Sequence, residues 1–347
     1  MAALTRSARV RVRGAMPGEG AAIAVLWREL WDAHEGWGGY PGSRDPRVYA
    51  QLAHRLDDDA RVRGGQPILG RHVHLVADLG GAPCGQVEGW FERHGVDGAT
   101  PFTCEVRSLI VSDSARGLGA GRALLEALAG SARVLSRGAP CVLAAEVLEP
   151  NPAQTFYARV GYAPVAWNAR IEAEHGAAAP ASGRVTARVA LAQDALAIAR
   201  LEATLAARRR AAGDIRFDRP RAIDATMVGA IAAHLAGDAG GSLHDPATLV
   251  AVDAAGLVRA VASFTVHALE PPFVPIRRAL IGRFAVDPAS PALPYVAPLA
   301  ALGCRLAVAQ GAPHVELTDL SAPGTELHAA ALATGATAWS RVVTRSV

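Results

Sequence analysis

The sequence predicts an α/β fold (α+β in the looser sense), built as two tandem mixed-sheet domains of which the second is degenerate. Three observations predict it. Segments of strand and helix character alternate along the 347 residues. The second half repeats the first at a shift of 175 residues. A small-residue stretch with Pro and Gly separates the halves. The predicted limits are 1–172 for the first domain, 173–183 for the linker and 184–347 for the second domain.

The repeat is carried by residues of the same type at equivalent positions. Arg13 and Asp78 recur as Arg188 and Asp253, and the same shift relates several apolar positions. A register that persists over this distance indicates a duplicated unit. The apolar pairs are Ile23 with Ile198, Leu26 with Leu201, Leu30 with Leu205, and Val111 with Val286.

Each element of the first half follows from a local pattern. Apolar residues at helical spacing, Ile23, Leu26 and Leu30 among them, predict a helix at 19–34. The turn residues Gly80 and Gly81 predict a hairpin between strands 74–78 and 85–93. A segment of loop or helix precedes the hairpin. The other predicted elements are strands at 10–13, 102–111, 141–147 and 164–173, and helices at 119–137 and 153–160.

Composition excludes several classes of function. A formal net charge of +3, from 35 basic and 32 acidic side chains, argues against a dedicated nucleic-acid binder. All basic side chains are Arg or His, so Schiff-base and P-loop chemistry, which need a lysine, are excluded. We expect no metal site, no membrane partner and a cytoplasmic location. The run Arg208-Arg209-Arg210 is expected to be a solvated helix face.

One segment predicts an anion site. A strand ending at Val111 is followed by a glycine-rich turn and a helix, with the spacing Arg116-x-x-Gly119-x-Gly121. The first amides of a helix lack intrahelical partners, and glycines let a phosphate approach the backbone. The spacing and the late position in the unit do not fit a dinucleotide fold. The turn therefore predicts a site for a different pyrophosphate.

These residues resemble the GNAT superfamily of acyl-CoA N-acyltransferases, whose motif is Arg/Gln-x-x-Gly-x-Gly/Ala. Asn151, Tyr157, Gly161 and Tyr162 resemble its closing motif. The resemblance implies transfer of an acyl group, acetyl in the first place, from acetyl-CoA or another acyl-CoA to a primary amine of a small molecule. The acyl transfer would be a direct attack on the thioester. A protein N-acetyltransferase and a non-catalytic CoA-binding pseudoenzyme stay open as alternatives.

The resemblance also implies roles for single residues. The strand backbone at Leu109, Ile110 and Val111 would pair with pantetheine, and Tyr157 would be the general acid that protonates the thiolate. Asn151 would orient the pantetheine or the turn that carries Tyr157, or it is only a helix N-cap. The diphosphate would be held by the turn and the start of the helix, at Arg116, Gly117, Leu118, Gly119, Ala120, Gly121 and Arg122.

The general base and the acceptor site are predicted from residue types. Strand alternation places Glu105 on one face with Arg107 and Leu109, near the acyl end. Glu105 is our first candidate for the base, with an ion pair to Arg107 or acceptor binding as alternatives. Glu146 is the second candidate. The expected acceptor residues are Trp37, Tyr40 and Trp90, the first two exposed between glycines.

The second half departs from the motif. The equivalent turn contains Pro288, Pro291 and Pro294 and has no glycine, so amides are missing where phosphates would bind. Ala331 stands at the position of Tyr157. We expect no CoA turnover there and a covering role for this half. The two-module plan resembles mycothiol synthase and the lipoglycopeptide antibiotic N-acyltransferases, although mycothiol synthase has its active module in the second half.

Overall fold

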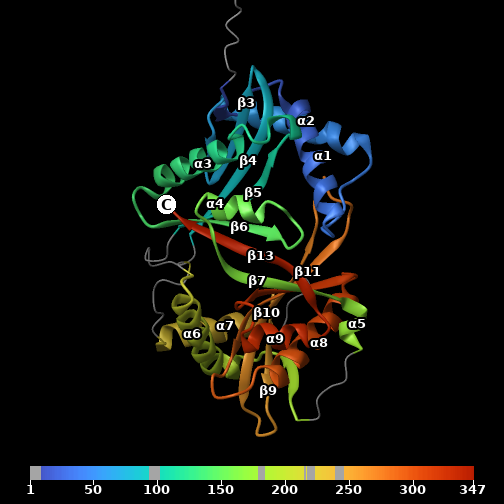
Figure 1. Ribbon diagram of the computed structural model, residues 1–347. Coiled ribbons are helices and arrows are strands. Elements are labelled where there is room, and N and C mark those ends of the chain that lie inside the picture. The colour runs from blue at the N-terminus through green and yellow to red at the C-terminus, as the bar shows by residue number, and fades with distance from the viewer. Residues whose placement is uncertain (1–8, 94–101, 179–183, 215, 217–222, 239–245) are drawn as a thin grey trace, which may run out of the picture.

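The computed structural model describes residues 9–93, 102–178, 184–214, 216, 223–238 and 246–347 (Figure 1). The strands of the first half are β1 (Arg11–Gly14), β2 (Ile68–Leu69), β3 (His72–Leu79), β4 (Ala82–Arg93), β5 (Phe102–Val111), β6 (Cys141–Leu148) and β7 (Ala163–Glu172). Its helices are α1 (Gly20–Gly36), α2 (Pro46–Arg63), the 3-10 turn η1 (Asp113–Ala115), α3 (Ala120–Ser136), α4 (Gln154–Arg159) and α5 (Ala173–Ala177). The elements predicted for this half form within three residues of their expected ends, and residues 46–63 are a helix.

The second half repeats this order. Its strands are β8 (Thr186–Val189), β9 (Ala247–Val252), β10 (Val258–Ala268), β11 (Arg277–Val286), β12 (His314–Leu320) and β13 (Thr337–Ser346). Its helices are η2 (Ala192–Asp194), α6 (Ala195–Ala211), α7 (Ala225–Asp238), α8 (Leu293–Ala309) and α9 (Glu326–Leu332). Ser108 in β5 and Arg283 in β11, which are 175 residues apart, both have positive φ, +53° and +55°. A shared local distortion at equivalent positions supports the predicted duplication.

The described strands form one mixed sheet of thirteen strands. The order is β1-β3-β4-β5-β6-β13-β7-β12-β11-β10-β9-β8, with β2 beside β3. The predicted class, α/β with tandem mixed-sheet units, is confirmed. Figure 1 shows the halves above and below a shared middle, which β13 and β7 cross.

The two halves exchange their last strands. β13, from the second half, pairs with β6, and β7, from the first half, pairs with β12, both antiparallel. Val343 of β13 packs in the core of the first half, and Ile171 of β7 packs in the core of the second. The domain limits at 172 and 184 stay a prediction, but neither half has a complete sheet without the other.

Helices cover both faces of the sheet. In the first half α3 lies over one face, with Leu124 and Leu128 fully buried, and α1 and α2 cover the other through Ile23, Leu52 and Leu56. In the second half α8 takes the place of α3, and α6 and α7 lie on the opposite face. We call the α3 side of the first half the α3 face and the other side the α1 face.

The predicted linker is partly structured. Its first residues form α5, whose Ala173 is fully buried and whose Gly176 packs against Cys304 of α8. A second contact joins the halves at the loop between α1 and α2. Ser43 N donates to Pro272 O (2.7 Å) in the β10–β11 loop, and the rings of Trp31 and Phe273 lie 4.3 Å apart. Among the described helices none combines the length and the apolarity that a membrane span requires.

Candidate active site

The strands β5 and β6 diverge at the predicted pantetheine edge. Within residues 102–178 their parallel pairing ends at Val106 opposite Ala145, although β5 continues to Val111 and β6 to Leu148. The backbone of β5 beyond Val106 is paired with β4 on one side only. Unpaired strand groups are ready hydrogen-bonding partners for an extended ligand. Leu109, Ile110 and Val111 lie on this open edge.

A β-bulge at Ser108 changes which residues share a face. The β4–β5 register shifts between Gln86–Ile110 and Glu88–Arg107, and Ser108 has φ +53°. Before the bulge, Cys104 and Val106 belong to the core under α3; after it, Leu109 and Val111 pack against that core. The prediction that Glu105, Arg107 and Leu109 share a face is therefore wrong, because the bulge inverts the alternation after Arg107. Leu109 lies on the α3 face and Glu105 on the α1 face.

The glycine-rich turn is exposed. Arg116, Gly117, Leu118 and Gly119 are all exposed, and Leu118 keeps 55% of its surface. Gly117 and Gly119 have φ of +79° and +85°, and a Cβ on either would contact nothing within 4 Å. The turn is thus open to a ligand rather than packed beneath side chains.

The start of α3 offers free amides beside this turn. The first helix bond runs from Ala123 N to Gly119 O (3.0 Å), so the amides of Ala120, Gly121 and Arg122 precede the helical ladder. Arg116 pairs with Asp113 (2.8 Å) and its Nε donates to Val111 O (3.3 Å). Arg122 is exposed. Two guanidinium groups and the helix dipole make this end of α3 attractive to a diphosphate.

Tyr157 lies in the core beneath the open edge. It is buried in the cluster that Leu109 and Val111 join, with its ring 5.2 Å from that of Tyr162 and 5.6 Å from that of Phe156. Burial raises the pKa of Tyr157, so its hydroxyl keeps its proton at neutral pH. A protonated phenol is the form that a general acid needs.

Asn151 has a local structural partner. Its Oδ1 accepts from Ala153 N (2.8 Å), and its own amide donates to Leu148 O (3.0 Å). This Asx turn leads into α4 and so positions Tyr157. The capping alternative is present in the structure, while a contact between Asn151 and pantetheine stays a prediction.

Glu105 is paired on the α1 face. Its carboxylate accepts from Arg107 Nη2 (2.5 Å), and both side chains are about half exposed (50% and 49%). Arg107 also lies over the ring of Trp90 (5.8 Å), which stacks on His72 (4.2 Å) and is 40% exposed. The ion pair that we kept as an alternative for Glu105 forms, and the predicted acceptor residue Trp90 stands next to it.

Glu146, the second candidate for the base, lies where β6 separates from β5. It directly follows Ala145, the last β6 residue paired with β5, and its side chain is 37% exposed. It accepts from Ser340 Oγ (2.6 Å) and Asn168 Nδ2 (2.9 Å), and Arg278 Nη2 lies 3.4 Å away. Burial would raise the pKa of Glu146, but Arg278 and the two neutral donors offset it and hold the pKa below its ordinary value.

Two of the residues that hold Glu146 come from the second half, and no sequence motif marks either of them. Arg278 lies in β11 and Ser340 in β13. Arg278 also forms a bidentate pair with the fully buried Glu316 (Nη2–Oε2, 2.5 Å). The one feature of the sequence that points to Arg278 is its place as the second residue of β11, a strand of the repeated unit. What it contacts depends on the strand exchange, which residue patterns do not show.

Tyr40 is buried, contrary to the prediction that it is exposed. It keeps 8% of its surface and its hydroxyl donates to Glu316 Oε1 (2.7 Å). The guanidinium of Arg170 lies 4.7 Å from its ring. The glycines around Trp37 and before Tyr40 favoured exposure, but the β10–β11 loop covers this segment. Trp37 is half-buried and packs against the same cluster, 5.6 Å from His34.

The equivalent turn of the second half has its own partners. Ala289 N donates to Asp287 Oδ1 (3.0 Å), Ser290 N to Asp287 O (2.9 Å), and Ala292 N at the start of α8 to Glu326 Oε1 (2.6 Å). A carboxylate thus occupies the helix end where a phosphate would bind in the first half. This supports the predicted degeneracy of the second module.

The run Arg208–Arg210 is not a solvated face. Arg209 keeps 2% of its surface and contacts Val165 O (3.1 Å), Asp319 (2.8 Å) and Asp214 (3.0 Å). Arg208 donates to Phe284 O (3.0 Å), which is the second-half equivalent of Leu109. The prediction was wrong because both side chains point into the second half. Arg208 binds the β11 backbone, and Arg209 binds groups of β7 and β12.

Comparison with known proteins finds one matching family model and several similar solved structures. Residues 70–164 match the family model of the acetyltransferase (GNAT) domain. No curated protein matches the sequence significantly. The solved structures include a GCN5-related N-acetyltransferase from Sphaerobacter thermophilus, with a TM-score of 0.55, 15% identity, and coverage of 97% of this chain and 96% of that one.

Two further solved structures are similar. One is a glucosamine N-acetyltransferase region of a fungal multi-domain β-N-acetylglucosaminidase (TM-score 0.53, 12% identity, 98% of this chain and 38% of that one). The other is a tandem GNAT protein from the clavulanic acid biosynthesis pathway (TM-score 0.48, 18% identity, 97% and 98%). At such identities the two structures with TM-scores of 0.55 and 0.53 show a shared fold only. The finer resemblance to mycothiol synthase stays a prediction.

Proposed function

We propose that the chain transfers an acyl group, acetyl in the simplest case, from acyl-CoA to a primary amine of a small molecule, and the match of residues 70–164 to the acetyltransferase (GNAT) family model supports this. The observation that carries this proposal is the continuity of the open β5 edge, which ends at Val111, with the exposed turn and the free amides of α3. An extended arm that ends in a diphosphate matches this series of donors.

The chain's own groups suffice to bind such a cosubstrate. The amides of Ala120, Gly121 and Arg122 and the guanidinium of Arg116 would hold the diphosphate. The backbone of Leu109 to Val111 would pair with the pantetheine amides, as an added strand does. The bulge at Ser108 turns the backbone at the acyl end, where an amide near Leu109 would polarise the thioester carbonyl.

Proton transfers are assigned to two residues on opposite faces of the sheet. Glu146 would accept the proton of the attacking ammonium or amine, directly or through one water. The amine nitrogen forms a bond to the acyl carbon, and the carbon–sulfur bond breaks. Tyr157 would give its proton to the leaving thiolate and recover one from solvent. Glu105 remains the other candidate for the base, although its ion pair with Arg107 makes it a weaker one.

A direct assay tests the proposal. Release of free thiol from acetyl-CoA should occur with at least one member of a panel of small amines. Glu146→Gln should lose about 10²-fold or more in kcat, the usual contribution of a general base, while Glu105→Gln should keep most of its activity. The two variants form a matched pair, because both remove one carboxylate charge from the α1 face. The opposite order of effects would return the base to Glu105.

Calorimetry, thiol release and mass spectrometry together separate the alternatives that the sequence left open. A pseudoenzyme would bind CoA and release no thiol with any amine. A protein N-acetyltransferase would acetylate proteins, as mass spectrometry would show, and would not acetylate free small amines. Failure to bind CoA at all would remove the proposal.

A further inference from the structure

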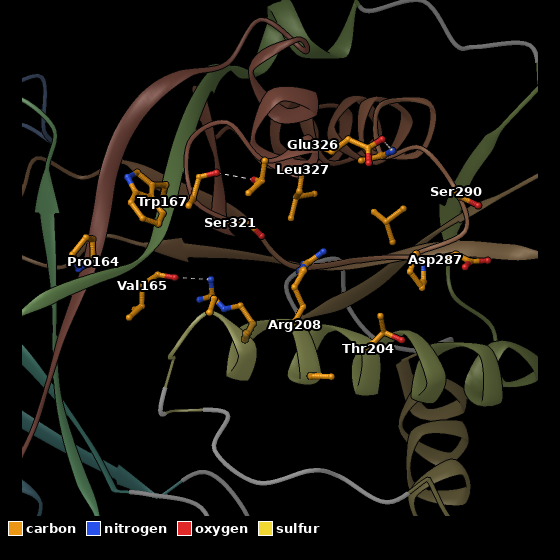
Figure 2. A pocket seen from close by; sticks show the side chains of 18 residues that line it. Pro164, Val165, Trp167, Thr204, Arg208, Asp287, Ser290, Ser321, Glu326 and Leu327 are labelled. Atoms are coloured by element: carbon orange, nitrogen blue, oxygen red, sulfur yellow. Dashed lines mark hydrogen bonds between the residues drawn. The ribbon is translucent and has the colours of Figure 1, made fainter.

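A cavity of about 620 Å³ opens in the second half (Figure 2). It lies between α6, the end of β11, the start of α9 and the exchanged strand β7. Its wall is mostly apolar, with Val165, Trp167, Ala207, Pro288 and Leu327 among the lining residues. The volume is within the range of small-molecule sites, about 300–1,000 Å³. This is the place that a pantetheine arm would take if the second module bound CoA.

The cavity is not built for CoA. The guanidinium of Arg208 donates to the carbonyl oxygen of Phe284 on the strand edge, and Glu326 accepts the amide of Ala292, the N-cap residue of α8. The three prolines of the turn have no amide hydrogen to donate. A thioester arm and its diphosphate would have to displace these internal contacts. Whatever binds here has to be shorter and has to use other groups.

The charges in the wall leave one cation uncompensated. Asp287 pairs with Arg259 (2.7 Å), and Arg209 pairs with Asp214 and Asp319. Within the described part of the chain Arg208 has no carboxylate partner, and its buried Nε has no hydrogen-bond acceptor. Figure 2 shows its side chain rising from α6 into the middle of the cavity, between Ser321 and Asp287.

The electrostatics agree with this geometry. Burial lowers the pKa of Arg208, and the positive charge of Arg209 lowers it further. The protein therefore holds this charge at a cost in free energy that a bound anion would offset. A single negative charge is enough for Arg208, because Asp287 and Arg209 have ionic partners and the carboxylate of Glu326 accepts the amide of Ala292.

We propose that this cavity binds a small organic acid, with one carboxylate on Arg208 and an aromatic or branched aliphatic body against Trp167 and Leu327. The site is separate from the diphosphate turn of the first half and does not depend on the proposed transfer reaction. A carboxylate fits the planar fork of a guanidinium, and the apolar wall selects a body without further charges.

Trp167 supplies the readout for a test. Simple aryl and branched alkyl acids, such as phenylacetate and 3-methylbutyrate, are titrated into the protein while tryptophan fluorescence is followed, and calorimetry gives the affinity. Each acid is matched with its primary amide, which has the same shape without the charge. We expect the amide to bind at least tenfold more weakly, and Trp167→Phe to remove the fluorescence change while leaving the calorimetric affinity within about threefold.

Two variants decide whether Arg208 is the anchor. Arg208→Gln should weaken the acid about 10- to 100-fold, the range for a charged hydrogen bond of about 1.5–3 kcal/mol. Arg208→Lys keeps the positive charge and serves as the test if the glutamine variant fails to fold. It should retain part of the wild-type affinity for the acid. Arg116→Gln in the first half should weaken CoA and leave the acid unaffected. Equal binding of acid and amide, unchanged affinity in Arg208→Gln, or no binding of any acid would overturn the proposal.

Discussion

Replacement of Arg278 by glutamine should move the acidic limb of the pH–rate profile to higher pH. Arg278 of the second half lies 3.4 Å from Glu146 and lowers the pKa of that carboxyl. If Glu146 is the base, it acts only when deprotonated, so its activity falls as the pH drops through its pKa. Without the guanidinium that pKa rises, and activity is lost at a pH where the wild type still works.

The size of the shift follows from the distance and the exposure. Two unit charges 3.4 Å apart attract by about 5 kcal/mol at an effective dielectric constant of about 20. Both side chains are partly exposed, 26% and 37%, so solvent screens much of this attraction. Ser340 and Asn168 also remain after the substitution. We therefore expect about 1–2 pKa units, or about 1.4–2.7 kcal/mol.

The assay needs a control for folding, because Arg278 also neutralises the buried Glu316. Removal of one partner of a buried pair costs about 3–5 kcal/mol. The double variant Arg278→Gln/Glu316→Gln removes both charges and should regain most of that stability, while it keeps the shifted profile. Glu316→Gln alone should leave the profile near that of the wild type. A folded double variant whose acidic limb does not move would refute the reasoning.

Three further predictions concern the first half. Tyr157→Phe should lose about 10²-fold or more in kcat and keep its affinity for CoA, measured by calorimetry, because only the hydroxyl is removed. Gly121→Ala should weaken the affinity for CoA several-fold, since its Cβ would lie 3.1 Å from Phe156. Gly130→Ala is the control in the same helix, because its Cβ would meet nothing within 4 Å, and it should raise the free energy of unfolding measured in denaturant by up to about 1 kcal/mol. Ser108→Val places a β-branched side chain at φ +53° and should cost about 1–2 kcal/mol and lower kcat/KM, while Ser108→Gly should do neither.

Much of the fold follows from patterns that act locally. The helix at 19–34 and the strand at 102–111 were predictable because apolar spacing reports directly which face is buried. The glycine-rich turn was predictable because positive φ at Gly117 and Gly119 requires that residue type. The repeat doubled this information, since each element of one half predicts its counterpart.

The remaining features depend on contacts between distant segments. The bulge at Ser108 changes the face of Leu109, and serine carries no strong signal for positive φ. Tyr40 is buried by a loop more than two hundred residues later in the chain. Arg209 looked like a surface cation, although its partners Asp214 and Asp319 make it a buried one. The residues next to each of these positions in the sequence are compatible with a regular strand or a bulge, and with exposure or burial. These three features could therefore be found only in the structure.

The exchange of β7 and β13 makes a strong prediction about cooperativity. Each of these strands completes a sheet and a core in the opposite half, with Val343 in one core and Ile171 in the other. A protease site inserted between residues 178 and 184 should therefore allow the chain to be cut without separating the halves. Separation would require β13 to leave β6 and β7 to leave β12 together, with loss of both ladders.

Size-exclusion chromatography checks this prediction after cleavage. The fragments should co-elute at the volume of the intact chain and separate only in denaturant, and calorimetry of the uncut protein should show one unfolding transition. Two domains that merely touch would come apart on dilution and melt in two steps, because each would keep its own core. That result would refute the strand exchange. It would also weaken the role of Arg278, since that side chain reaches Glu146 only while the two halves share one sheet.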